Sequence, residues 1–283
     1  MNGFRDADKT RTLLTAVVLA AIVGLAFYVR MIPHERCFQN GEVYLYGQDP
    51  YYHFMRIQSA ASSTSLEVPD YDPYAGFPDG FHPFWPSYFD QGVALIGRLV
   101  AGGTPSEYLM LQVSAWVPVI LGALAVLPVF WISSLAFGRW AALLSALMFA
   151  LMPGHVMNTI IGRIDHHGAE ILFPLLHYAF YLRARQSAMI SRPGEGIWAS
   201  LFSGLALGAS FLIWPGASLY LGVTGLHHFC QVLYEERFEA GRRININFLI
   251  MILVALIIII PACSTSYWGR NQSIEYDALS WFQ

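Results

Sequence analysis

Two short segments of the chain carry side chains that could take part in chemistry. The first is Gly47-Gln48-Asp49-Pro50-Tyr51-Tyr52-His53-Phe54-Met55-Arg56, which follows the first apolar segment. Because proline restricts the residue before it, we expect the backbone of Asp49 to be extended or in a turn, with a helix beginning at Pro50. The Asp49 carboxylate could cap this helix, bind a cation or substrate, or do both.

The second segment is Gly162-Arg163-Ile164-Asp165-His166-His167-Gly168. A carboxylate oxygen and an imidazole nitrogen two residues apart can face one cation, and this ligand pair suits Mn²⁺, Fe²⁺ or Zn²⁺ better than Ca²⁺. A polar cap for the following helix would use the same residue types. However, three ionisable side chains in a row at a membrane boundary cost free energy unless they have a role, so a functional site is favoured here.

Other polar residues give weaker signals. Glu275, in Ser273-Ile274-Glu275-Tyr276, is a third acidic candidate, although a solvated loop position is the ordinary case for a glutamate. His177, His227 and His228 lie within or beside apolar segments, where packing is more common than metal binding. The sequence has no GxSxG or HExxH motif and no Gly-rich phosphate loop, which argues against a nucleotide-driven pump. Its cysteines lack CxxC spacing, which argues against a zinc site or a disulfide scaffold.

The elements that must position these residues are membrane-spanning helices. Of the 283 residues, 55% are hydrophobic and only 12% are charged, and the mean hydropathy is +0.46. Soluble domains carry about 25% charged residues, so much of this surface must face a lipid bilayer. The net charge of -3 gives no indication of a nucleic-acid partner. We therefore expect an all-α integral membrane protein.

A membrane-spanning helix needs about 20 mostly apolar residues, and seven segments of this chain qualify. They lie near residues 12–32, 109–136, 140–158, 168–183, 196–213, 216–234 and 245–263. Lys and Arg accumulate in every second connection, which places those connections and the N-terminus in the cytoplasm. The basic residues are Arg5, Lys9, Arg11, Arg139, Arg183, Arg185, Arg192, Arg237, Arg242 and Arg243. We expect a multi-pass protein of the cell membrane with both polar motifs on the outer face.

The first outer loop, residues 33–108, is long and rich in aromatic residues, Pro and Gly. Such a composition is typical of an ordered loop docked on the membrane face, and loops of this length usually have a function. Within it, segment 88–103 is moderately apolar. If this segment crossed the membrane, every later basic loop would move to the outer side. We therefore expect it to lie at the membrane surface or to re-enter the membrane.

The two motifs resemble those of a known family. Asp49-Pro50-Tyr51-Tyr52-His53 resembles the first acidic motif of the oligosaccharyltransferase catalytic subunit family. Gly162-x-x-Asp165-His166-His167 resembles its second motif, in the variant closest to archaeal and archaeal-like bacterial members. Gly80-Phe81-His82-Pro83-Phe84-Trp85-Pro86-Ser87-Tyr88-Phe89-Asp90 resembles its first outer loop. The resemblance runs from the first span to the end of the chain, and the order, spacing and shared side of the motifs make it specific.

The resemblance implies a GT-C membrane fold. It implies the transfer of a glycan from a polyprenyl-phosphate-linked donor to the asparagine amide of Asn-x-Ser/Thr in an acceptor polypeptide, with Mn²⁺ or Mg²⁺ as cofactor. Asp49 would be catalytic and would contact the metal and the acceptor amide, and Asp165 and His167 would be the other metal ligands. The candidate substrate-binding residues are Arg163, His166, His53 and Arg56.

The chain departs from the family pattern at three places. The family's catalytic Glu lies in a later Ser/Thr-x-x-Glu loop, whereas Glu275 follows Gln272 and comes about two spans earlier, so we expect the third acidic residue beyond residue 283. The C-terminal soluble domain with its Trp-Trp-Asp motif is absent, so we expect this chain to be the N-terminal part of a longer protein. Some members carry an arginine seven residues before the second-motif aspartate, where this chain has Asn158, and Arg163 could substitute for it.

Two other classes of protein remain open. Another GT-C enzyme could use a polyprenyl-phosphate sugar to modify lipid A or protein hydroxyls. Such enzymes usually carry an acidic pair in the first outer loop and lack the Asp-His-His motif. A transporter or a non-catalytic membrane subunit would place ionisable residues along a path inside the spans. In this sequence they cluster at the outer edge, which argues against transport.

Overall fold

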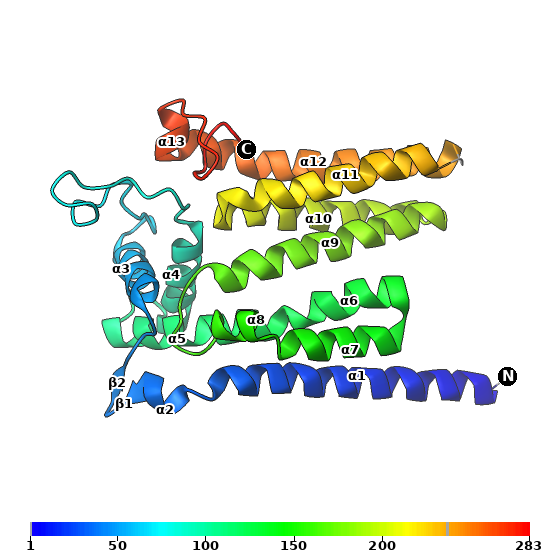
Figure 1. Ribbon diagram of the computed structural model, residues 1–283, viewed down its shortest axis with the longest axis horizontal. Helices are drawn as coiled ribbons and strands as arrows, with labels where there is room; N and C mark the ends of the chain where they lie inside the picture. The colour runs from blue at the N-terminus through cyan, green and yellow to red at the C-terminus, as the bar shows by residue number, and fades with distance from the viewer. Residues whose placement is uncertain (1, 236–237) are drawn as a thin grey trace.

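The computed structural model describes residues 2–235 and 238–283, and these residues form a bundle of helices (Figure 1). The elements are α1 (Asn2–Met31), α2 (His34–Cys37), β1 (Phe38–Gln39), β2 (Glu42–Val43), α3 (Gln48–Ser62), α4 (Tyr88–Ala101), α5 (Glu107–Leu124), α6 (Val126–Phe137), α7 (Arg139–Ala150), α8 (Pro153–Met157), α9 (His167–Met189), α10 (Pro193–Ile213), η1 (Pro215–Ala217), α11 (Ser218–Tyr234), α12 (Phe238–Thr265) and α13 (Tyr267–Arg270). The two short strands pair antiparallel.

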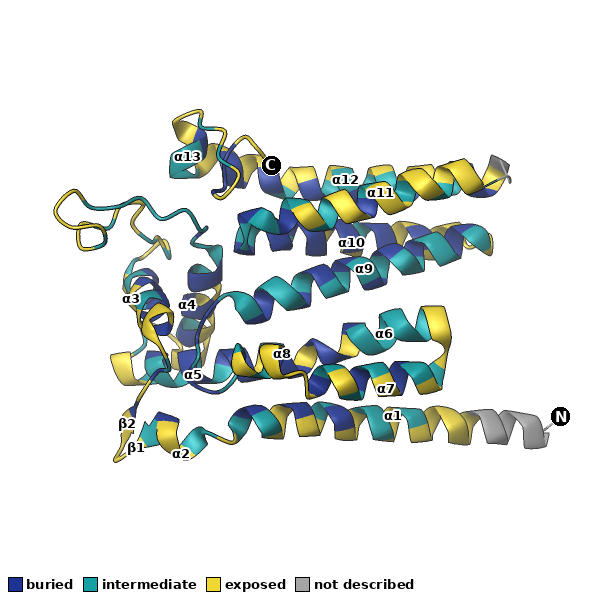
Figure 2. Ribbon diagram, in the orientation of Figure 1, coloured by how far each residue is buried: buried dark blue, intermediate teal, exposed yellow. Residues whose placement is uncertain are grey.

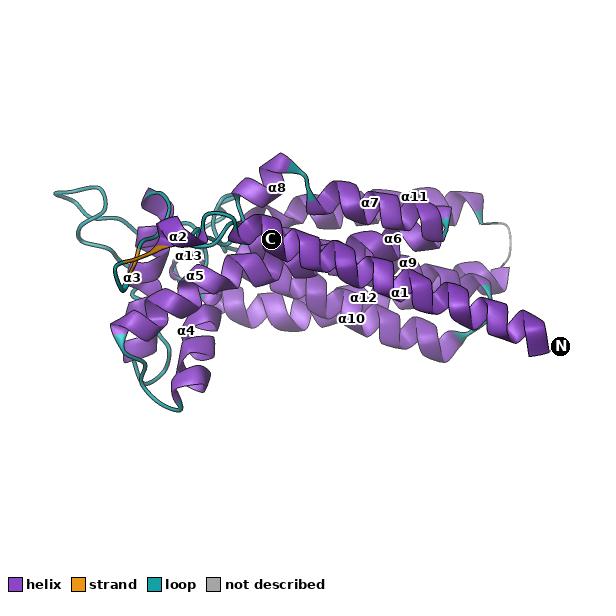
Figure 3. Ribbon diagram, turned by 90° about the horizontal axis from the view of Figure 1, so that it is seen from below, coloured by secondary structure: helices purple, strands orange, loops and turns teal. Residues whose placement is uncertain are grey.

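The long helices lie side by side, and the short elements gather at one end of them (Figures 1 and 3). Helix α10 packs between α9 and α12, while α1 packs on α5 and α7. Small residues allow the close approach of α10 and α12: a Cβ added at Gly204 would lie 2.5 Å from the carbonyl oxygen of Met251. Small residues at helix contacts are typical of membrane bundles, where the gain comes from packing rather than from water exclusion.

Helices occur at all seven positions where the sequence predicts spans. By length and composition, four helical segments could cross a membrane: Lys9–Cys37, Glu107–Phe137, Pro193–Ile213 and Glu239–Thr265. Exposed apolar side chains support a lipid-facing surface. On α11 they recur every three to four residues, so they form one stripe along a largely exposed helix (Figure 2). These side chains are Leu219, Val223, Leu226, Phe229 and Leu233.

Segment 140–158 is not one continuous helix. Helix α7 ends at Ala150, and the short helix α8 begins at Pro153 after an extended residue, Met152. Proline disfavours a helical conformation in the residue before it and cannot donate a helical hydrogen bond, so the helix stops here. The short helix α8 then leads into the loop that carries Asp165.

The long outer loop is ordered around α3 and α4, which turn across the end of the long helices (Figure 1). Helix α4 covers most of the moderately apolar segment 88–103 and packs on α3 and α5. It therefore lies at the end of the bundle, as we expect for a helix that does not span the membrane. The opposite end carries the start of α1 and the α6–α7 and α9–α10 turns (Figure 1). Arg139 is the first residue of α7, and Arg192 precedes α10. Arg237 lies outside the described residues.

Candidate functional site

The loop before α9 is held in place by backbone hydrogen bonds to three other segments. The amide of Ile161 donates to the carbonyl of Arg30, the amide of Gly162 donates to the carbonyl of Ala115, and the carbonyl of Gly162 accepts from Tyr46. Gly162 has a φ of +81°, and a Cβ there would lie 2.7 Å from the Sγ of Cys37. Only glycine fits this backbone, so the first residue of the second motif fixes the path of the loop.

Helix α3 presents the first motif to this loop. The helix begins at Gln48 after Gly47, which has a φ of +101°, and no side chain caps it. The expectation that Asp49 is the cap of a helix beginning at Pro50 is therefore wrong. Pro50 lies within the first turn, where its missing N–H would have no helical partner. The spacing places Asp49, His53 and Arg56 on one face of α3.

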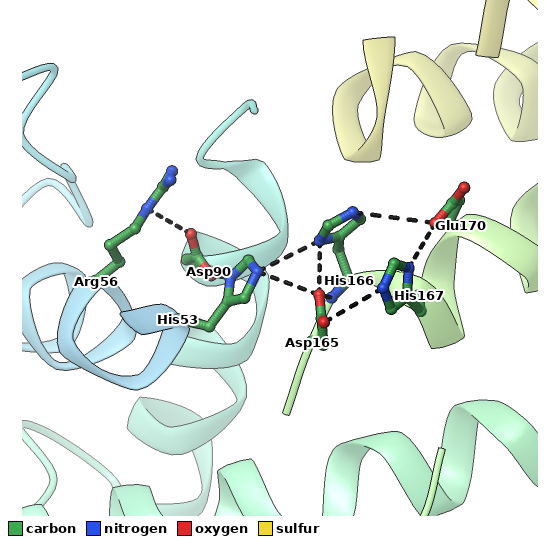
Figure 4. Close-up of polar contacts among 7 residues, drawn as sticks. All are labelled: His53, Arg56, Asp90, Asp165, His166, His167 and Glu170. Atoms are coloured by element: carbon green, nitrogen blue, oxygen red, sulfur yellow. Dashed lines mark hydrogen bonds and ion pairs between the residues drawn. The ribbon is translucent and has the colours of Figure 1, made fainter. Parts of the chain in front are cut away.

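Asp165 lies at the centre of the cluster that these two segments form (Figure 4). Its Oδ1 atom lies 3.3 Å from His53 Nε2 and 2.8 Å from His166 Nδ1, and its Oδ2 atom lies 3.4 Å from His167 Nε2. The backbone amide of His166 also donates to Oδ1 at 2.7 Å. Burial raises the pKa of Asp165, but the hydrogen bonds from His166 and His53 outweigh it, so the pKa lies well below the usual range. The carboxylate is therefore held charged.

Asp90, on α4, is the first residue of the cluster that the sequence did not single out. It is fully buried, and its Oδ1 atom lies 2.6 Å from His53 Nδ1 (Figure 4). Its Oδ2 atom lies 2.8 Å from Arg56 Nε as an ion pair, without the alignment of a hydrogen bond. Burial lowers the pKa of His53, but the charge of Asp90 and the hydrogen bonds to Asp165 and Asp90 raise it to about 9. The sequence does contain a signal for this contact: Asp90 is an aspartate within an apolar segment, and a buried charge needs a partner.

Glu170 is the second such residue. Its Oε2 atom lies 2.9 Å from His167 Nδ1 and 4.0 Å from His166 Nε2. The hydrogen bond to Glu170 is the largest cause of the raised pKa of His167. Because Glu170 follows His167 by three residues in α9, helical spacing could have found this pair. Glu170 contacts Nδ1 of His167 and leaves Nε2 facing Asp165.

The clustered side chains fit a divalent cation. Two groups have ligand atoms within 4.8 Å of one another: His53 with Asp165 and His166, and His166 with His167 and Glu170. Imidazole and carboxylate together suit Mn²⁺ better than Mg²⁺, which prefers oxygen ligands and retains water. Asp165 and His167, two of the three expected ligands, lie together.

Asp49 is not in either group. Its side chain is exposed and, within residues 2–235 and 238–283, it makes no hydrogen bond or ion pair. It lies one helical turn before His53 on the same face of α3.

Comparisons with known proteins identify the family of the chain. The family model described as oligosaccharyl transferase STT3, N-terminal, matches residues 13–274. The chain belongs to the STT3 family. Dolichyl-phosphooligosaccharide-protein glycotransferase 1 of Archaeoglobus fulgidus is 29% identical over 283 residues, covering 93% of this chain and 44% of that protein. This STT3-family chain therefore spans less than half the length of that curated relative.

Solved structures of the Archaeoglobus fulgidus oligosaccharyltransferase share the fold. The archaeal AglB enzyme, in complex with an inhibitory peptide and a dolichol-phosphate, superposes with a TM-score of 0.82 at 20% identity, covering 95% of this chain and 31% of that one. The form tethered to an acceptor peptide containing the NVT sequon gives a TM-score of 0.82 at 21% identity, covering 94% and 31%. The expected all-α membrane fold is confirmed.

The remaining candidates lie around or away from the cluster of this STT3-family chain. Arg163 is half-buried, and its Nε atom has no hydrogen-bond partner within the described parts of the chain. The amide of Asn158 donates to the carbonyl of Gly154 and so stays within its own turn. Glu275 bonds through its backbone to Ser280 and is not among the clustered ligands of the described residues.

His177 lies away from this cluster and has the packing role expected of it. Its ring nitrogens lie within hydrogen-bonding distance of the Ser203 and Thr224 hydroxyl groups, which belong to α10 and α11. All three residues are buried, so these contacts join α9 to two neighbouring helices.

Proposed function

We propose that this STT3-family chain takes part in protein N-glycosylation, as a metal-dependent transferase. A glycan passes from a polyprenyl-phosphate-linked donor to the side-chain amide of asparagine in an Asn-x-Ser/Thr acceptor. The observation that carries the proposal is the convergence of the α3 motif and the loop before α9 on Asp165, at one end of a helical membrane bundle. The family match supports the reaction class.

The chemical problem is that an amide nitrogen is a poor nucleophile, since its lone pair is delocalised into the carbonyl. A carboxylate that accepts a hydrogen bond from the amide N–H weakens this delocalisation. We assign that role to Asp49, because it is exposed one helical turn before His53, whereas Asp165 is enclosed by histidines. Preorganised charges of this kind act strongly in a site that is partly shielded from water.

Asp49, Asp165 and His167 are the proposed ligands of Mn²⁺ or Mg²⁺, with the donor chemistry favouring Mn²⁺. When bound, the ion supplies positive charge that lets carboxylates sit close together and stabilises the leaving phosphate. Asp90 and Glu170 hold His53 and His167 by their Nδ1 atoms, so the opposite nitrogens face Asp165. Outer partners of this kind orient metal-binding side chains.

The four candidate substrate-binding residues then separate into two groups. Arg163 borders the cluster and His166 belongs to it, and both are only half-buried, so each is accessible enough to contact the donor phosphate. His53 is 4% exposed and lies between two carboxylates, so it orients Asp165 and does not contact substrate. Arg56, which is 5% exposed, pairs with Asp90 and lines a neighbouring cavity.

The proposed orientation has seven spans, a cytoplasmic N-terminus and the cluster at the outer face of the cell membrane. It is supported by the basic residues of the α6–α7 and α9–α10 connections, which lie at the end opposite the cluster (Figure 1). Basic residues near span ends favour the cytoplasmic side.

The test uses membranes from cells that express the complete gene carrying these residues, with a lipid-linked glycan extract and a labelled Asn-x-Thr peptide. Asp49→Ala and Asp165→Asn each reduce transfer by on the order of 100-fold or more, because each removes charge at the reacting centre. Removing divalent ions abolishes transfer, and Mn²⁺ restores it. Asp79→Asn, an exposed aspartate of the same outer loop, serves as the matched control.

Transfer at the wild-type rate by Asp165→Asn would overturn the proposal. A product in which the sugar is attached to a serine or threonine of a peptide lacking asparagine would indicate the alternative GT-C reaction instead. Glutamine carries the same amide as asparagine on a longer side chain. If a peptide with Gln in place of Asn stays unmodified, the result supports an acceptor amide held at the length of the asparagine side chain.

A further inference from the structure

A basic cavity lies at the end of the bundle opposite the Asp165 cluster, where α1 and α7 pack against each other (Figure 1). Its volume is about 350 Å³. The lining residues are Arg11, Leu14, Thr15 and Val18 of α1 and Arg139, Trp140 and Leu143 of α7. None of them belongs to the Asp165 cluster, so the proposed transfer gives this cavity no role.

Helical spacing forms the two walls of the cavity. Positions 11, 14, 15 and 18 recur every three to four residues, so they share one face of α1. Arg139 and Leu143 lie four residues apart and share a face of α7. Val18 and Leu143 also pack in the hydrophobic core that joins the two helices. The cavity is therefore basic at the tip of the bundle and apolar toward its middle.

The basic end lies at the level of lipid headgroups. At a rise of about 1.5 Å per residue, Arg11 lies about 30 Å from Met31, the last residue of α1, and a bilayer has a hydrocarbon core of about this thickness. The segment Lys9–Cys37 is long and apolar enough to cross it. Trp140 is exposed beside Arg139, and tryptophan is enriched at the membrane–water interface. A lipid headgroup can therefore reach both arginines.

The two arginines of the cavity lack a counter-charge. Among the side chains that the structure describes, neither Arg11 nor Arg139 has a partner in an ion pair or a side-chain hydrogen bond. By contrast, Arg192, near the same end of the bundle, pairs with Glu195 at 3.0 Å. Because two guanidinium groups at one cavity repel each other, an anion there is favoured electrostatically. A guanidinium group binds phosphate oxygens through its planar fork of donors.

Apolar side chains continue from the cavity toward the middle of the bundle. Val17 on α1 and Leu144 and Met148 on α7 are exposed. An acyl chain can lie against such a surface, whereas a soluble anion would use only the arginines. The combination of unpaired basic groups with an apolar surface beyond them fits a lipid better than a free phosphate.

We propose that this cavity binds the phosphate headgroup of an anionic phospholipid, in the leaflet at the end of the bundle opposite the Asp165 cluster. The phosphate accepts hydrogen bonds from Arg11 and Arg139, and an acyl chain follows the apolar surface of α1 and α7. In the proposed orientation this is the cytoplasmic leaflet, where anionic lipids attract basic residues. The inference does not depend on glycan transfer, because the cavity and the cluster share no residue.

The test measures the binding of single lipids to the complete protein in detergent by native mass spectrometry. Phosphatidylglycerol binds more tightly than phosphatidylcholine, whose headgroup has no net charge. Arg11→Gln and Arg139→Gln each weaken the binding of phosphatidylglycerol about fivefold, and together about thirtyfold, because each removes one cationic contact. Arg192→Gln, which changes an arginine that is paired with Glu195, is the matched control and leaves the affinity unchanged.

A charge-conserving variant separates a lost contact from damage to the fold. Arg11→Lys combined with Arg139→Lys keeps both charges, and it binds phosphatidylglycerol within about fivefold of the wild type. The double Gln variant unfolds at the temperature of the wild type, since it removes no ion pair between described side chains.

A second measurement locates the lipid in the wild-type protein. Phosphatidylglycerol with a photoreactive acyl chain crosslinks to peptides that contain residues 14–18 or 140–148. Excess unlabelled phosphatidylglycerol prevents this crosslinking, while phosphatidylcholine and inorganic phosphate do not. Asp165→Asn gives the same crosslinks as the wild type, because Asp165 does not line the cavity.

Four results would overturn the inference. The first two are equal binding of the two lipids and wild-type affinity in the double Gln variant. The third is competition by inorganic phosphate, since the cavity is then a site for a free anion. The fourth concerns Asp6 and Asp8, which precede Arg11 in the sequence and whose side chains are outside the described part of the chain. If Asp6→Asn combined with Asp8→Asn raises the lipid affinity tenfold or more, the chain's own carboxylates occupy the cavity.

Discussion

His53 Nδ1 lies 2.6 Å from Oδ1 of Asp90, and both side chains are buried. This pair joins α3 to α4 and turns the other ring nitrogen of His53 toward Asp165. Asp90, a residue of the outer loop, thereby orients the His53 ring that contacts the second motif, although Asp90 does not contact Asp165 itself. The first predictions follow from this relationship.

Asp90→Ala destabilises the protein by about 3–5 kcal/mol, because it leaves His53 and Arg56 buried without their shared counter-charge. The measurement is thermal unfolding in detergent, followed by tryptophan fluorescence. Asp79→Asn, which changes an exposed aspartate, is expected to unfold within about 0.5 kcal/mol of the wild type. If Asp90→Ala is as stable as the wild type, the Asp90–His53 pair contributes nothing to the free energy of unfolding.

The stability of the metal-free protein falls as the pH rises through about 9, since the pKa of His53 is raised to about 9 in the folded state. The protonated ring faces Asp90 and Asp165, with Arg56 and His166 as the nearby basic groups. A raised pKa contributes stability that is complete below the unfolded value near 6.5 and is lost as the pH passes the folded value.

The measurement for this prediction is the unfolding temperature between pH 6 and pH 10 in EDTA. The difference between wild type and His53→Gln is largest at the acidic end and shrinks toward the alkaline end. A difference that stays constant over the whole range contradicts the assignment.

Glu170→Gln lowers the affinity for Mn²⁺ about 10-fold to 100-fold, because the amide holds the Nδ1 atom of His167 less firmly than the carboxylate does. Binding is measured by the loss of the free Mn²⁺ signal in electron paramagnetic resonance. His167→Ala removes a proposed ligand and lowers the affinity further. Glu107→Gln, at the first turn of α5, is the matched control. If the affinity of Glu170→Gln equals that of the wild type, Glu170 does not position the ligand.

Gly162→Ala destabilises the protein by about 1–3 kcal/mol, because alanine is strained at a φ of +81° and its Cβ would meet Cys37. Gly154→Ala provides the comparison: its added Cβ meets nothing within 4 Å, and it lies in helix α8. We expect Gly154→Ala to be neutral or slightly stabilising. Unfolding measurements on both variants separate the local strain from a general effect of losing a glycine.

The sequence by itself determined the membrane class, the helical positions and the two acidic motifs. These features depend on local composition: long apolar segments form helices in lipid because their backbone polar groups must be paired internally. Asp49, Asp165 and His167 could be singled out because their types and spacing are visible in short segments. The family resemblance came from the same short segments and is confirmed by the match over residues 13–274.

Only the tertiary structure decided which side chains meet. The contacts of His53 with Asp90 and Asp165 join α3, α4 and the loop before α9, and no local spacing encodes them. The path of the loop before α9 also depends on distant segments, since Ile161 and Gly162 bond to Arg30, Ala115 and Tyr46. A sequence pattern shows the periodicity of one element only. A buried charge network depends on all the elements that pack around it and exclude water.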